Sequence, residues 1–221
     1  MIFKLFRRTP RDNTIACLYG TIVAQARLPA FYQIYGVPDT VDGRLEMIML
    51  HTVLFLRRLE SEAAPIRALG QGLFDRFCRD MDDSMREMGV GDLALPRNMR
   101  RIGEAFYGRQ AAYRVALEAS DDEPLAAALD RNVFADGSEP GPALRLAVYV
   151  REAVRRLAAE ATQLRDHLSP LREQAKSEEE LASLEHLLEN GQSIIDATSK
   201  LPPPTPEQKG KKKADKPKEK N

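Results

Sequence analysis

The residues of this sequence that could carry chemistry are few and scattered. The three histidines, His51, His167 and His186, lie far apart, and none belongs to a pair at the spacing of metal ligands. The two cysteines, Cys17 and Cys78, stand in apolar helical contexts, which supports neither a disulfide framework nor a thiolate metal site. We therefore interpret both cysteines as reduced packing residues.

A cluster of carboxylates is the other feature that could bind a ligand. It consists of Asp80, Asp82, Asp83 and Glu87. A di-metal site in a helical bundle needs inward-projecting Glu-x-x-His motifs, and the sequence contains none. It also lacks a glycine-rich phosphate loop, zinc-ligand spacing and a nucleophile elbow. We therefore interpret the cluster as a solvated surface that can face a partner, and we predict a protein that is not an enzyme and has no cofactor.

His51 is the histidine with two open interpretations. It lies within a long apolar stretch, where a histidine is commonly satisfied by hydrogen bonds inside the fold. In the competing interpretation, His51 and an aromatic pocket of Tyr19, Phe31, Tyr32 and Tyr35 bind haem or lipid, so that the protein would be a carrier or enzyme for such a ligand.

The elements that must position these residues are helices. Of the 221 residues, 43% are hydrophobic and 30% are charged, which is typical of a globular protein. Leu, Ala, Glu and Arg, which favour helices, outnumber Val and Ile. We predict an all-α fold with a compact multi-helix domain, a long helical hairpin and a disordered basic tail.

Apolar residues at helical spacing place the individual helices. They predict helices over residues 14–27, 43–59, about 65–88, 97–119 and about 124–134, and a short helical turn after Pro29. The helix at 43–59 should be central, because its apolar face is broad. Gly103 and Gly108 weaken their helix by roughly 1 kcal/mol each, and a close backbone approach would explain their presence.

The sequence after residue 142 has a different character. The clearest break in the chain is at 136–142; a long helix is expected at 144–168, interrupted by Ser169 and Pro170, and a second at about 177–198. These two helices predict an antiparallel hairpin, which either folds back on the body or meets another chain. In the second case the protein would be a coiled-coil scaffold that dimerises through residues 157–195.

These patterns divide the chain into four regions. They are a flexible basic and apolar N-terminus (1–13), a compact helical domain (14–142), a helical hairpin (143–199) and a disordered Lys/Pro-rich tail (200–221). The tail holds eight lysines against three acidic residues, a net charge of +5, which favours polyanions or anionic membrane. The N-terminus could add weak affinity for a membrane surface.

The sequence limits the possible partners and location. The longest apolar run, 47–56, is far shorter than the roughly 20 residues of a bilayer span, and no secretory signal is recognisable. Arg97, Arg100, Arg101 and Arg109 could touch phosphates, but no base-reading module accompanies them, so we expect no sequence-specific nucleic acid.

The chain from about Leu18 to Leu117 resembles, in the order and spacing of several short motifs, the ubiquinol–cytochrome c chaperone family, which assembles respiratory complex III. The motifs are Leu18-Tyr19-Gly20, Gln25-Ala26-Arg27-Leu28-Pro29-Ala30-Phe31-Tyr32, Gly36-Val37-Pro38-Asp39-Thr40-Val41-Asp42-Gly43-Arg44-Leu45-Glu46, Leu50-His51, Asp80-Met81-Asp82, Met85-Arg86-Glu87-Met88-Gly89-Val90-Gly91-Asp92-Leu93 and Gly108-Arg109-Gln110-Ala111-Ala112-Tyr113. They span nearly half of the chain.

The resemblance implies a helical chaperone, not an enzyme, that binds newly made cytochrome b until haem and partner subunits are added. It also implies, for mitochondrial members, a small second assembly factor and association with the ribosome. The short N-terminus looks bacterial, which predicts a cytoplasmic, peripheral location at the cytoplasmic face of the inner membrane.

The resemblance also supplies the candidate partner-binding residues, because they are members of the matched motifs. They are Tyr19, Arg27, Phe31, Tyr32, Asp39, Asp42, Arg44, His51, Asp82, Arg86, Glu87, Asp92, Arg109 and Tyr113. Many of the charged ones are also suited to fixing loops by charge-assisted hydrogen bonds. A further set of methionines could adapt to apolar client helices or could simply fill the core: Met47, Met49, Met81, Met85 and Met88.

Overall fold

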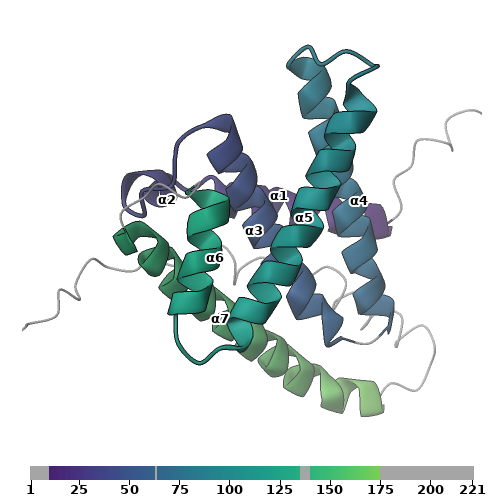
Figure 1. Cartoon of the computed structure of the whole chain (residues 1–221). Coiled ribbons are helices and arrows are strands. Elements are labelled where there is room, and N and C mark those ends of the chain that lie inside the picture. Colours follow the sequence, from purple (N-terminus) through teal and green to yellow (C-terminus); the bar gives the residue numbers. More distant parts are fainter. Residues whose placement is uncertain (1–9, 63, 135–139, 175–221) are drawn as a thin grey trace, which may run out of the picture.

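A computed structural model describes residues 10–62, 64–134 and 140–174, with the backbone alone for 10–11, 65–66, 140 and 160–174. These residues form seven helices and no strand (Figure 1). The helices are α1 (Pro10–Ala26), α2 (Pro29–Gln33), α3 (Val41–Glu60), α4 (Ala64–Glu87), α5 (Leu95–Glu118), α6 (Glu123–Val133) and α7 (Pro140–Gln174). The prediction of an all-α fold is confirmed.

Helix α3 is the central element, as its broad apolar face predicts. Every residue from Glu46 to Phe55 is buried, and the helix packs against α1, α4, α5, α6 and α7. A helix that is buried on all sides must be apolar or internally satisfied all round. The Thr52 hydroxyl accordingly donates to the Ile48 carbonyl, 2.8 Å away.

Local signals fix where α3 and α4 begin or end. The Thr40 hydroxyl accepts a hydrogen bond from the Gly43 backbone N–H at 3.1 Å, which caps the N-terminus of α3. Gly89, with φ of 83°, follows the C-terminus of α4 in the left-handed conformation that glycine favours. Helices α3, α4 and α5 alternate in direction, so the start of α3 and the loop between α4 and α5 lie at the same end of the molecule (Figure 1).

The long helix α7 differs from the sequence prediction at two places. It begins at Pro140, inside the expected break, because proline in a first helical turn lacks only an N–H that would be unpaired there. It also continues past Pro170 to Gln174, since a proline removes one hydrogen bond and can kink a helix without ending it. The expected interruption at Ser169 and Pro170 is therefore wrong.

The expected reason for two glycines is also wrong. A Cβ atom added at Gly103 or Gly108 would meet no atom within 4 Å, so no backbone of the described residues approaches either position closely. The N-terminus at 1–9, the second hairpin helix at about 177–198 and the lysine tail lie outside the described residues. Among the described helices, none combines the length and apolarity that crossing a bilayer requires.

Candidate partner-binding surface

His51 lies in a buried cluster of aromatic rings contributed by three helices. Its ring centroid is 5.3 Å from that of Phe31 on α2 and 5.8 Å from that of Tyr149 on α7. Tyr35, just after α2, packs edge-on against Tyr149, with centroids 5.9 Å apart. Edge-to-face packing of this kind stabilises aromatic pairs beyond their buried area. The cluster therefore joins α2, α3 and α7.

Both ring nitrogens of His51 have hydrogen-bond partners. Nδ1 lies 2.8 Å from the Met47 carbonyl, which can only accept, so this nitrogen carries the proton. Nε2 then accepts from the Tyr149 hydroxyl at 2.9 Å, and that hydroxyl accepts in turn from the Gln25 amide at 3.2 Å. Burial lowers the pKa of His51 to about 4, against a smaller opposing effect of the Met47 hydrogen bond. His51 is neutral at physiological pH.

This geometry favours the structural interpretation of His51 over the carrier interpretation. A haem iron would need one ring nitrogen, and either nitrogen would have to give up its hydrogen bond within the core. No group of three or more His, Cys, Asp or Glu side chains suited to a metal occurs among the described residues. The carrier hypothesis therefore gains no support from the geometry around His51.

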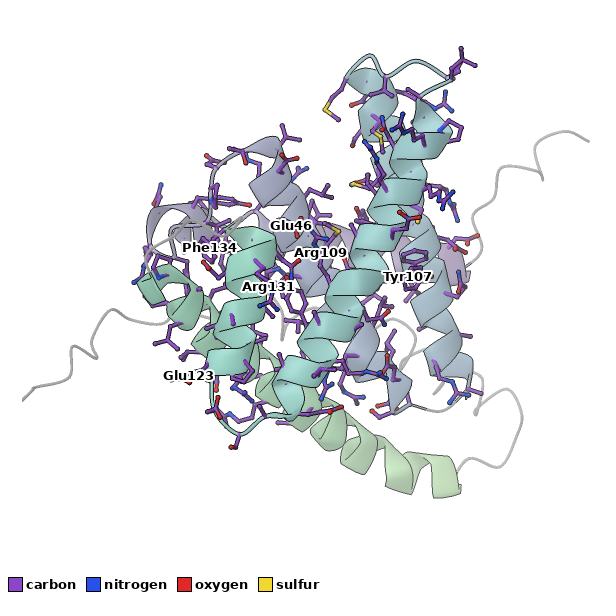
Figure 2. All side chains as sticks on the ribbon, viewed as in Figure 1. Glu46, Tyr107, Arg109, Glu123, Arg131 and Phe134 are labelled. Atoms are coloured by element: carbon purple, nitrogen blue, oxygen red, sulfur yellow. The ribbon has the colours of Figure 1, made fainter. Side chains whose placement is uncertain are left out.

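Glu46 and Arg109 form a largely buried ion pair that ties α3 to α5 (Figure 2). The pair is bidentate: Nε of Arg109 donates to Oε2 of Glu46, and Nη2 of Arg109 donates to Oε1 of Glu46. Burial raises the pKa of Glu46, and the Arg109 guanidinium opposes that rise. Removing one member would leave the other charge buried without a partner, so Arg109 supports the fold.

A second polar group lies at the turn between α2 and α3. Arg44 donates to Asp39 at 2.7 Å and stands over the Tyr32 ring, 5.9 Å from its centroid. This hydrogen bond lowers the pKa of Asp39. The Tyr32 hydroxyl donates to the Ala26 carbonyl at 2.9 Å. The turn is thus held in shape while Asp39, Val41 and Arg44 stay exposed.

The hairpin formed by the end of α4 and the start of α5 presents another exposed group. Arg86 bridges Asp82 and Asp92, with nitrogen–oxygen distances of 2.8 Å to each, and so ties the loop to α4. Beside this fork, Met88 is 60% exposed and Leu93 is fully exposed. Burying apolar side chains such as these on a partner is favourable, and the rigid fork lowers the ordering cost of doing so.

The structure separates the candidate residues into an inner and an outer set. Tyr19, Phe31, His51 and Tyr113 are buried in the core, and Arg109 is largely buried. A partner that docks on this fold as it stands would not reach those four core side chains. The exposed or partly exposed set, which stays a prediction, consists of Arg27, Tyr32, Asp39, Asp42, Arg44, Asp82, Arg86, Glu87 and Asp92.

The methionines and the cysteines also fall into a buried and an exposed set. Met47 and Met49 are core residues, Met81 and Met85 are buried between helices, and Met88 is exposed. Cys78 is partly buried, as a packing residue would be, whereas Cys17 is exposed on α1. The prediction that Cys17 is a packing residue is therefore wrong, because it lies on the outer face of its helix.

Sequence reasoning missed several residues of the buried ion pair, of the aromatic cluster around His51 and of the α4–α5 loop. Glu46 sits among apolar neighbours on α3, and a carboxylate in such a place is a signal for a buried partner. Tyr149 gives no such local signal, since its partner His51 is 98 residues away. Leu93 has the appearance of an ordinary core leucine in the sequence.

We define the end surface as the exposed residues of the α2–α3 turn and of the α4–α5 hairpin tip. Its members are Ile34, Asp39, Val41, Arg44, Arg86, Met88 and Leu93. Figure 1 shows the start of α3 and the α4–α5 loop at the same end of the molecule. Four of the eight large apolar side chains that are exposed in the described part of the chain belong to this surface. Methionine and arginine beside exposed aliphatic residues are typical of protein–protein interfaces.

Two comparisons with known proteins give matches for this chain. Residues 33–166 match the family described as Ubiquinol-cytochrome C chaperone, which is more than half of the chain. The chain is also similar to the crystal structure of the Cbp3 homolog from Brucella abortus, with 41% sequence identity and a TM-score of 0.63. That similarity covers 72% of this chain and 88% of the other. Among curated proteins, none matches the sequence.

Proposed function

Because this chain belongs to the ubiquinol–cytochrome c chaperone family, we propose that it binds newly synthesised cytochrome b during biogenesis of the ubiquinol–cytochrome c reductase complex. Family membership supports the broader role, an assembly chaperone for complex III. The identity of the client and the surface that contacts it are our proposal.

The observation that carries the proposal is the end surface, where Leu93, Met88 and Val41 are 100%, 60% and 66% exposed. Exposed aliphatic side chains at a helical tip provide contact area for an apolar client. The thioether of Met88 adapts to irregular apolar surfaces at low cost. A newly made membrane subunit exposes apolar helices until it is assembled, and such helices fit this surface.

The arginines of the end surface suit the polar ends of such a client. Arg44 and Arg86 each already pair with aspartates, which fixes their position and keeps part of each guanidinium exposed to solvent. Preorganised donors of this kind add specificity at little ordering cost. A client loop that carries carboxylates or free carbonyls would be held next to the apolar contacts.

The proposal includes a place and further partners. The protein would act as a peripheral protein at the cytoplasmic face of a bacterial inner membrane. Its basic tail, with a net charge of +5, supports contact with anionic membrane or with ribosomal RNA. A small second assembly factor would be a further partner.

The proposal is tested by isolating the tagged full-length protein from cells that are making cytochrome b. We expect newly labelled cytochrome b to co-purify, and deletion of the gene to lower complex III while the other respiratory complexes persist. A tagged, unrelated all-helical protein serves as the control for non-specific capture of membrane subunits. Normal complex III in the deletion strain would contradict the proposal.

A further inference from the structure

A groove lies far from the end surface, between the C-terminal end of α3 and α7. Its volume is about 470 Å³. Leu54 and Leu157 are buried along its apolar floor, and Val154 is partly buried beside them. This places an apolar depression at the point where α3 ends and α7 runs on for more than a dozen residues.

The charged residues that line this groove come from α3: Arg57, Arg58 and Glu60. Arg58 donates to the Leu157 carbonyl at 3.1 Å, which fixes the end of α3 to α7, and it also pairs with Glu62. On α7, Arg155 and Arg156 share the single carboxylate of Glu152. With Glu60 and Glu62 included, these four arginines stand beside three carboxylates, and this small positive excess favours an apolar segment that brings acidic side chains with it.

The chain itself contains such a segment, outside the described residues. Residues 177–198 carry six acidic side chains and no lysine or arginine. Their apolar residues recur at helical spacing: Leu181, Leu184, Leu188 and Ile195. The sequence match to the family ends at residue 166, so this segment lies beyond it.

The length of the chain fits the distance to the groove. Helix α7 ends at Gln174, and residues 175–176 would allow a short reversal. Because an α-helix rises about 1.5 Å per residue, a returning helix that started at 177 would bring residue 195 level with residue 156 of α7. Ile195 would then lie beside the groove residues Val154 and Leu157.

We propose that residues 177–198 fold back along α7 and seat Ile195 in the groove between α3 and α7 of the same chain. The groove is then an internal docking site, closed by apolar contact and by pairing of the acidic segment with the surrounding arginines. This inference does not depend on the proposed function, because it concerns a contact within the chain.

Thiol cross-linking in the full-length protein tests the proposal. Cys17 and Cys78 are first replaced by serine, because Cys17 is exposed and would react. Ala158→Cys is then combined with Ile195→Cys in one variant and with Ser193→Cys in another, and both are treated with a short bifunctional maleimide. We expect an intrachain cross-link in the first variant and little in the second.

The second variant is the matched control, because it separates docking from random encounter. Position 193 is 35 residues from 158 in sequence, and position 195 is 37 residues away. An unstructured segment would therefore cross-link the two pairs about equally, because the cost of loop closure changes little over two residues. On a docked helix, position 193 lies on the face opposite to position 195 and points away from the groove. Equal yields for the two pairs would overturn the proposal.

The same experiment identifies other occupants of the groove. A covalent dimer from the Ile195→Cys variant, formed also between differently tagged chains, would show that a second copy fills the groove and would overturn the proposal. Hydrogen exchange gives a second measurement: Ile195→Asp should deprotect residues 54–61, whereas Ser193→Asp adds the same charge on the opposite helical face and should not. Equal protection in both variants would also overturn it.

Discussion

The hydroxyl of Tyr149 is the residue-scale link that holds three helices around His51. It donates to His51 Nε2 and accepts from Gln25, both inside the core. Tyr149→Phe leaves these two polar groups buried without a partner, which we expect to lower the free energy of unfolding by about 1–3 kcal/mol. Urea denaturation measures this change.

Tyr35→Phe is the matched control for this substitution. Tyr35 packs in the same ring cluster, but its hydroxyl makes no hydrogen bond within the described part of the chain. Its removal should change the free energy of unfolding little. Equal losses for the two variants would show that the hydrogen bonds of Tyr149 contribute nothing.

The pKa of His51 makes the stability of the protein depend on pH. Burial lowers this pKa to about 4 in the folded state, from about 6.5 in an unfolded chain. The neighbouring Tyr149 and Tyr35 stay neutral here, because burial raises both of their pKa values. As the pH falls below about 6.5 the unfolded state binds a proton first, so stability is lost down to about pH 4, by up to about 1.4 kcal/mol per pH unit.

Urea denaturation between pH 7.5 and 4.5 measures this dependence. His51→Gln removes the titrating group, so the variant should show a smaller slope over the same range, whatever its stability at neutral pH. The two remaining histidines, His167 and His186, are common to both proteins and cancel in the comparison. Identical slopes would mean that His51 is not the group responsible.

At the scale of the elements, two glycines should respond in opposite ways to alanine. A Cβ at Gly43 would overlap the backbone carbonyl of Pro38, so Gly43→Ala must displace the turn that caps α3 and should cost about 1–3 kcal/mol. Gly103 lies inside α5 with open space around it, so Gly103→Ala should stabilise the protein by up to about 1 kcal/mol. Thermal unfolding of both variants checks the signs, and a stabilising Gly43→Ala would contradict the packing of this turn.

The helices were predictable because their signals are local. The apolar spacing and Pro29 lie within the helices that they define, and Gly89 lies two residues after α4. The predicted bounds of α3 to α6 agree with the structure to within two residues, whereas α1 begins at Pro10, four residues before the predicted start at 14. The start and course of α7 were not predicted, since a proline commonly marks a helix boundary, whereas here the one at 140 suits a first helical turn and the one at 170 lies inside the helix. The partner of His51 was missed for a different reason: Tyr149 lies within the predicted helix at 144–168, but it is 98 residues away from His51 in the sequence.

At the scale of the whole molecule, the motifs indicated the family but not which of their residues face solvent. Tyr19 and Tyr113 belong to matched motifs and are core residues, whereas Leu93 is also in a motif and is fully exposed. Side-chain type alone predicts the exposure of these residues wrongly, because a leucine is more commonly buried than a tyrosine. The exposure of a single leucine depends on how α4 and α5 extend beyond the body, which only the assembled fold determines.

That exposure leads to a prediction about client binding, which depends on the proposed function. Met88→Asp combined with Leu93→Asp places charge where an apolar client helix would dock, and we expect the amount of co-purified cytochrome b to fall about tenfold or more. Both side chains are exposed, so the melting temperature should stay near that of the unmodified protein. Val115→Asp is the control, because Val115 is 64% exposed on α5, outside the end surface. If Val115→Asp reduces cytochrome b as strongly as the double variant, the client is held by another face of the molecule; if neither variant reduces it, the end surface is not the docking site.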